Sequence, residues 1–429
     1  MPLPDPGLLG GGLVATLIGG VLAMAQTAIT GRWLAACARE LAEGTSGPLV
    51  PATPAEAVDR SASIRLATLA VVVGLWWWEV RCFGELPRDA AGLTLAVPFA
   101  AVAGRWLAHS LLFWLLAAAS WIDLRYRVIP DWITIPGFLA GLVIAWILPE
   151  TLLPVAAEVA RPFATPLLEA DVLGWAGPLV HGLAARGAGG GATPIMLVVA
   201  LALFTVWWIV GTGPDFSGVA DALPEGDGAA AVAAPLPPAS WWPRLALLAA
   251  GWLAVAGAWA IGGVRFEGLF TALVGAVVAG GIVWGTRAGA SLALGREAMG
   301  LGDVTLMAMV GAWLGWQASV LACFLGVLFG LVHAVVQIVR HRESELPFGP
   351  GLCMGTAAVV VGWRPLWETA AASFADTGQL VGIVVAVVVG TALSLWVWSS
   401  LGPAARRLVL AAMVLLGVFL VGWLLMLQG

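Results

Sequence analysis

The strongest constraint on this chain is a series of long apolar runs, each about as long as a helix that crosses a bilayer. Hydrophobic residues fill 61% of 429 positions and charged residues only 10%, whereas soluble domains carry roughly 25% charged residues. Lipid offers the backbone no hydrogen-bond partners, so runs of ~20 apolar residues must form helices or closed barrels. Because these runs are continuous rather than alternating, the sequence predicts an all-α, polytopic transmembrane helical bundle.

The length criterion predicts about twelve membrane segments. They cover residues 8–30, 64–80, 104–122, 133–149, 194–211, 245–262, 268–286, 304–316, 317–339, 352–363, 379–398 and 408–427. Residues 91–103 are also apolar, and they could form a separate span, a re-entrant piece or the start of the next helix. Three polar or Gly/Pro-rich stretches, 44–62, 150–193 and 212–243, are predicted loops, the last of them a flexible linker.

Arginine positions predict the orientation of these spans, because short cytoplasmic loops are rich in basic residues. Four of the loops that carry arginine are marked by Arg125 and Arg127, Arg287 and Arg296, Arg340 and Arg342, and Arg406 and Arg407. When the spans are threaded in order from residue 104, all four loops fall on one side. We therefore expect these loops to be cytoplasmic, and the orientation of the N-terminus stays open.

Composition argues against several classes of function. The net charge is −5 and no basic tract occurs, which argues against nucleic acid as a partner. The four cysteines form no CxxC motif, and the four histidines show no metal-ligand spacing with acids or cysteines, so neither a metal nor a cofactor is predicted. The N-terminus lacks a basic signal region, and the apolar run after it is interpreted as a retained membrane helix.

Acidic residues are scarce in this chain, and two of them stand where a membrane helix is predicted to end or begin. Asp123 ends a long apolar helix, and Pro130 then restarts the chain. Asp303 follows Gly300-Leu301-Gly302 and opens another apolar helix. Two carboxyls within a few Å share one proton, so together they can activate water and polarise a peptide carbonyl without a metal. Ionisable groups at membrane depth are costly and usually functional.

Each of these acids also has an ordinary structural interpretation. An aspartate at a helix end is often an anchor at the membrane interface or an N-cap, which suits Asp303 at a helix start. Asp131, directly after Pro130, is a plausible N-cap for the following helix. Position alone therefore does not separate a catalytic role from a structural one.

Several motifs together resemble the type IV prepilin peptidase family of GxGD-type membrane aspartyl proteases. They are, in family order, Ile122-Asp123-Leu124-Arg125, Ile129-Pro130-Asp131, Gly300-Leu301-Gly302-Asp303-Val304 and Pro347-Phe348-Gly349-Pro350. The resemblance covers residues of about 104–149 and 264–363. It implies that Asp123 and Asp303 are catalytic, with supporting residues Gly300, Gly302, Pro130, Asp131, Pro347, Phe348, Gly349 and Pro350.

The resemblance also implies the reaction and its setting. Family members are aspartic endopeptidases that remove the leader from type IV prepilins and from the pseudopilins of type II secretion. They cut on the cytoplasmic face of the bacterial inner membrane. The implied partners are single-helix substrates and the lipid bilayer. No cofactor is implied for this step, and the sequence does not predict an oligomeric state.

The sequence departs from the family pattern in three ways. The two aspartates lie 180 positions apart, farther than is usual, which fits an insertion. Thr305 stands where the family often has a lysine two residues after the aspartate. Bifunctional members also N-methylate the new terminus and carry an N-terminal domain with CxxC motifs. Residues 31–63 are too short for that domain and hold only Cys37, so methyltransferase activity is not expected.

These features divide the chain into five expected segments. They are 1–103, N-terminal membrane segments without the CxxC domain; 104–149, the first part of the peptidase core; 150–263, an insertion with loops and two spans; 264–363, the second part of the core; and 364–429, a C-terminal membrane extension. Two alternatives to the protease remain open: an Asp-lined transporter, and a non-catalytic membrane scaffold of a pilus or secretion system.

Overall fold

The computed structural model describes most of the predicted helices and few of the predicted loops. The described residues are 66–86, 99–156, 164–166, 194–212, 241–295, 299–341, 348–375 and 377–400, with the single positions 21 and 402. Two predicted spans, 8–30 and 408–427, therefore lie outside the described residues, apart from position 21. The loop predicted at 44–62 and most of the loops at 150–193 and 212–243 lie outside them as well.

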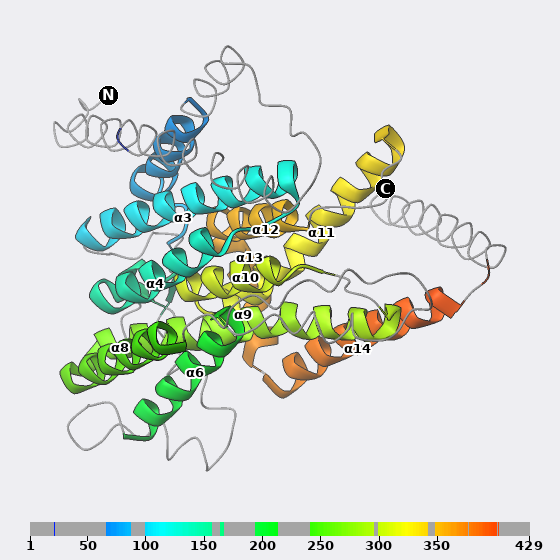
Figure 1. Cartoon of the computed structure of the whole chain (residues 1–429). Helices are drawn as coiled ribbons and strands as arrows, with labels where there is room; N and C mark the ends of the chain where they lie inside the picture. The colour runs from blue at the N-terminus through cyan, green and yellow to red at the C-terminus, as the bar shows by residue number, and fades with distance from the viewer. Residues whose placement is uncertain are drawn as a thin grey trace, which may run out of the picture. The chain divides into compact units, whose positions relative to one another are not determined.

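The described chain is helical almost throughout (Figure 1). Helical residues 66–75 continue into η1 (Trp76–Arg81), a π-helix. The elements that follow are α3 (Phe99–Tyr126), α4 (Asp131–Ile147), η2 (Pro149–Thr151), β1 (Pro154–Ala156), β2 (Ala164–Pro166), α6 (Pro194–Thr212), α8 (Trp241–Ile261), α9 (Gly263–Leu294), α10 (Leu301–Leu314), α11 (Trp316–His341), α12 (Gly349–Val361), α13 (Trp363–Ala375) and α14 (Thr377–Ser400). Within the described residues, the exception to the all-α prediction is a short antiparallel ribbon in which Val155 of β1 pairs with Thr165 of β2.

Four described helices are long and apolar enough to cross a membrane, so the chain is an integral membrane protein. The four segments are Phe99–Leu124, Pro194–Gly211, Gly263–Leu294 and Trp316–His333. Other apolar helices are shorter: α10 has 14 residues and α12 has 13, which gives each about 20 Å of length against a hydrocarbon core of ~30 Å. The count of twelve spans stays a prediction. Of the ambiguous segment 91–103, residues 99–103 belong to α3.

The chain divides into two compact units. The larger comprises residues 1–213, 232–283 and 301–377, and the smaller comprises 214–231, 284–300 and 378–429. In the smaller unit, Arg287 Nε donates a hydrogen bond of 2.8 Å to the carbonyl oxygen of Met299. All the sequence motifs except Gly300 fall in the larger unit, which is therefore the unit that holds the candidate site.

Helix α10 lies at the centre of the larger unit, and every residue from Asp303 to Leu314 is buried. A helix that is apolar on all sides must be surrounded by protein or lipid, and here other helices surround it. On one side, Trp313 Nε1 donates a hydrogen bond of 2.8 Å to the carbonyl oxygen of Gly137 in α4. On another side, Gly311 meets Gly275 of α9 so closely that a Cβ on either would strike the other's backbone. Small residues allow this approach.

Helices α11 and α12 also pack backbone to backbone, which fixes the start of α12. A Cβ on Gly326 of α11 would lie 2.9 Å from the side chain of Leu352, and a Cβ on Gly351 would lie 2.8 Å from the carbonyl oxygen of Gly326. Glycines at both positions leave no side chain between the two helices. The N-terminus of α12 is thereby held in one position relative to α11.

Candidate active site

Asp123 lies in the last turn of α3, and the local sequence ends the helix just after it. Arg127 adopts the left-handed conformation with φ of 57°, and its N–H donates a hydrogen bond of 2.8 Å to the carbonyl oxygen of Asp123. This is a common way to end a helix. Pro130 then has an extended backbone and is the N-cap residue of α4. The Asp123 side chain is only 5% exposed, so it is held inside the helical bundle.

The Asp123 carboxylate meets the N-terminus of α12. The backbone N–H of Gly349 donates a hydrogen bond of 3.1 Å to Asp123 Oδ2. The first N–H groups of a helix lack partners within it and favour a negative charge. A Cβ at position 349 would lie 2.6 Å from Asp123 Oδ2 and 2.8 Å from Ile129 Cδ1, so this contact requires glycine.

Asp303 lies in the first turn of α10, directly after a glycine that packs against the loop from α3. A Cβ on Gly302 would lie 2.8 Å from the carbonyl oxygen of Ile129 and 2.9 Å from its Cβ. The glycine therefore allows the start of α10 to approach the backbone of residues 127–130. The Asp303 side chain is 9% exposed, and its Oδ1 has no hydrogen-bond partner among the described residues.

The two carboxyls belong to one site although they are far apart in the sequence. Asp303 lies close enough to Asp123 for the charge of one to act on the other. The buried thiol of Cys353, one turn into α12, interacts electrostatically with both. Low polarity strengthens the repulsion between two carboxylates, so burial in one site disfavours the ionisation of both carboxyls at the same time.

A short hydrogen-bond chain holds the start of α10 against α4. Thr134 Oγ1 donates to Thr305 Oγ1 at 3.1 Å, and Thr305 Oγ1 donates to the carbonyl oxygen of Gly302 at 3.1 Å. Both threonines are buried. Thr305, which stands where the related motif often has lysine, therefore joins the two helices beside Asp303.

The model of the type IV leader peptidase family matches residues 110–221 and 241–335. The chain is 39% identical over 104 residues to the prepilin leader peptidase/N-methyltransferase of Pseudomonas aeruginosa, covering 24% of this chain and 34% of that protein. The protein of the same name from Aeromonas salmonicida is 35% identical over 98 residues, covering 22% and 32%.

Over these segments the chain is similar to the type IV leader peptidase family. A further relative, the prepilin leader peptidase/N-methyltransferase of Escherichia coli, is 36% identical over 90 residues, which covers 20% of this chain and 40% of that protein. The chain thus spans only about a third of the length of the first relatives it matches. No solved structure matches it.

The family model also bears on the segment expected to be an insertion. Its match runs without a break from residue 110 to 221 and resumes at 241, so it includes much of 150–263. The five segment boundaries stay predictions.

The supporting residues implied by the family motifs lie in different surroundings. Pro130 and Pro350 are buried, and Phe348 is half-buried as the N-cap residue of α12. Gly300 is exposed just before α10, and Pro347 lies outside the described residues. The N-cap role suggested for Asp131 is wrong, because Pro130 occupies that position and Asp131 is the exposed first residue of α4.

Sequence reasoning assigned no role to three residues that build this candidate site. Ile129 forms the wall against which Gly302 and Gly349 pack. Thr134 makes the hydrogen bond to Thr305, and Cys353 lies beside both carboxyls. Thr134 is a polar residue in an apolar run, three positions after Asp131. Its polarity could have indicated a hydrogen bond to another helix. Ile129 is part of the motif Ile129-Pro130-Asp131, but nothing in the sequence shows that glycines pack against it, because an apolar residue before a proline is common.

Proposed function

We propose that this chain is an aspartic endopeptidase that cleaves the leader from type IV prepilins or pseudopilins, with Asp123 and Asp303 as its catalytic pair. The observation that carries the proposal is the approach of two buried acids, 180 positions apart, where the ends of α3, α10 and α12 meet. Acids that only cap or anchor helix ends do not need to lie close to one another, whereas two carboxyls that share a proton must do so.

The geometry supports a division of labour between the two carboxyls. Gly349 N–H holds Asp123 Oδ2 in a fixed direction. Asp303 Oδ1 has no described hydrogen-bond partner and can bond to a water molecule or to the scissile carbonyl. In the proposed reaction, the ionised carboxyl takes a proton from the attacking water while the protonated one donates to the carbonyl oxygen. The pair then returns the proton to the leaving amine.

The proposed substrate is a single apolar helix with a short basic leader. The site lies at helix ends rather than in mid-helix, and the loop of residues 127–130 passes beside it. An extended segment next to a substrate helix would reach such a site without unfolding within the bilayer, where unpaired backbone groups are costly. Together with the arginine distribution, this supports cleavage on the cytoplasmic face of the bacterial inner membrane. The proposal leaves N-methylation out, because the sequence contains no CxxC motif.

The direct test is co-expression of the full chain with candidate prepilins from the same genome, with leader loss scored by mass spectrometry. We expect the wild-type chain and Glu368→Gln, an exposed control on α13, to remove the leader after a glycine. Asp303→Asn should accumulate full-length prepilin while inserting into membranes at normal levels.

Two outcomes would count against the proposal. Leader loss with Asp303→Asn equal to that of the Glu368→Gln control would refute the catalytic role of this acid. If the wild-type chain cleaves none of the prepilins and pseudopilins tested, the scaffold interpretation is favoured.

A further inference from the structure

A second group of buried ionisable residues lies in the larger unit, away from the aspartate pair. Glu79 of η1, Glu85 of the loop after it and His109 of α3 are each at most 2% exposed. Arg105, one turn before His109, is buried beside them and interacts electrostatically with both glutamates. His109 precedes Asp123 by fourteen residues on one helix, a separation of about 21 Å. The group is therefore distinct from the proposed catalytic site.

Three ligand atoms of this group converge on a small volume. His109 Nδ1 lies 2.9 Å from Glu79 Oε1 and 3.3 Å from Glu85 Oε1. One ligand atom from each of the three residues lies within 4.8 Å of the other two. Bonds of 2.0–2.2 Å from a tetrahedral metal ion to nitrogen or oxygen separate neighbouring ligand atoms by about 3.3–3.6 Å. The contact of His109 Nδ1 with Glu85 Oε1 is within that range, and its contact with Glu79 Oε1 is a hydrogen bond that would lengthen by a few tenths of an ångström around an ion.

Hydrogen bonds among the described residues leave much of this group unpaired. Both Glu85 oxygens, Glu79 Oε2 and His109 Nε2 have no hydrogen-bond partner there. A single N–H on His109 Nδ1 cannot fully serve two carboxylates, and a protonated imidazole would also bury an unpaired N–H at Nε2. Buried polar atoms in native proteins are normally paired, and one ion bound between the three side chains would contact all of them at once.

The charges of the group allow a cation to bind. Arg105 interacts electrostatically with Glu79 and Glu85, which are both buried. When His109 is neutral, the form in which an imidazole binds a metal, Arg105 alone opposes two buried carboxylates. A cation would supply further positive charge beside them.

We propose that Glu79, Glu85 and His109 bind a divalent transition-metal ion. One imidazole nitrogen and two carboxylates suit Zn²⁺ best and Mn²⁺ next, with a fourth position left for water. His109 has no metal-ligand spacing in the sequence, because Glu79 lies 30 residues earlier. The fold brings these residues together through close helix packing.

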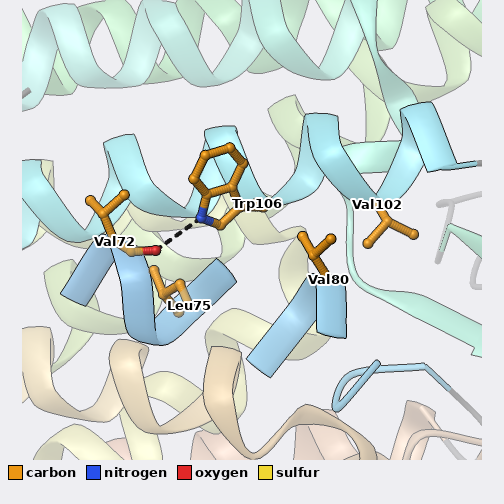
Figure 2. Packing of buried hydrophobic residues seen from close by; sticks show 5 residues of the cluster. All are labelled: Val72, Leu75, Val80, Val102 and Trp106. Atoms are coloured by element: carbon orange, nitrogen blue, oxygen red, sulfur yellow. Dashed lines mark hydrogen bonds between the residues drawn. The ribbon is translucent and has the colours of Figure 1, made fainter. Parts of the chain in front are cut away.

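The packing around the group suits a structural metal clamp. Val72, Leu75 and Val80 pack against Val102 and Trp106 of α3, as Figure 2 shows. Trp106 Nε1 donates a hydrogen bond of 3.1 Å to the carbonyl oxygen of Val72. A cation held by both segments would join residues 66–86 to α3 at the next turn of that helix.

The test is metal content of the full chain, purified in detergent, stripped with a chelator and dialysed against Zn²⁺ or Mn²⁺. We expect about one ion per chain for the wild-type protein. Glu85→Gln and His109→Gln should each lower the affinity at least about tenfold. Matched controls are Glu368→Gln and His333→Gln, which change the same residue types on α13 and α11 and should retain the wild-type metal content.

Two results would overturn the inference. One is wild-type protein that retains neither ion. The other is Glu85→Gln protein with the metal content of its Glu368→Gln control. Because Glu85 lies in a loop, its variant keeps the test valid even if His109→Gln fails to fold. Metal content is measured independently of leader cleavage, so failure of this inference is distinguishable from failure of the proposed function.

Discussion

At the scale of single residues, position 349 has no room for any side chain. An alanine there would bring its Cβ within 2.6 Å of Asp123 Oδ2, so the carboxylate must turn away from the helix N-terminus. We predict that Gly349→Ala lowers the rate of leader cleavage roughly 10²-fold, the cost of a displacement of about 1 Å at a reacting group. Rates measured on purified protein test this.

Gly390→Ala serves as the control for that substitution. Gly390 lies in α14, and a Cβ there would meet no atom within 4 Å. Cleavage by Gly349→Ala at the rate of this control would show that the Asp123 contact does not matter for activity.

The threonine pair beside Asp303 permits a second test at this scale. Thr305→Val leaves the buried hydroxyl of Thr134 without its partner, which should cost about 1–3 kcal/mol of stability. The double substitution with Thr134→Val removes both polar groups and should cost less than the single one. Thermal unfolding in detergent measures the stability of both variants. A double variant that is less stable than Thr305→Val alone would contradict the predicted coupling.

The sequence draws attention to the two acids but not to the packing of their neighbours. Asp123 and Asp303 stand out because acids are rare in this chain and both lie at helix ends. The contacts of Ile129 and Thr134 depend on how α4 and α10 pack, which no local pattern encodes. Glu79 and Glu85 follow an apolar run, and ionisable residues at membrane depth usually have a function. These acids were therefore a further signal in the sequence.

At the scale of helices, glycine contacts decide how closely α9 and α10 approach. A Cβ at Gly311 would strike the carbonyl group of Gly275, so Gly311→Ala should destabilise the protein by about 1–3 kcal/mol through overpacking. The matched control is Gly281→Ala on α9, where a Cβ meets no atom within 4 Å. That control should be neutral or stabilising by up to about 1 kcal/mol. Equal unfolding temperatures for the two variants would contradict this account.

The apolar runs predicted where the helices lie, but they did not predict which helices are long enough to cross the membrane. Ten of the twelve predicted spans coincide with described helices. Helices α10 and α12 are nevertheless short, and α10 is enclosed by protein. An apolar run shielded by other helices looks the same in sequence as one that faces lipid. The amphipathic α13 was not predicted as a span or helix because its apolar residues are interrupted.

At the scale of the whole molecule, the candidate site consists of helix ends that are distant in the sequence. Helices α3, α10 and α12 each contribute one end to the site, and the larger unit contains all three. The resemblance to the leader peptidase family and the membrane helices were predicted correctly from motif order and apolar runs. The orientation across the membrane and the insertion between the aspartates stay predictions, because orientation depends on the bilayer and an insertion is defined only against the length of other family members.

The most direct test of the central claim is the cleavage rate of purified Asp123→Asn, Asp303→Asn and the double variant on one prepilin. If the two carboxyls act as a unit, each single variant should lose about 10²–10⁴-fold in rate. The double variant should then lose little more than either alone. A single variant that keeps the wild-type rate, or losses that multiply independently in the double variant, would contradict joint catalysis by this pair.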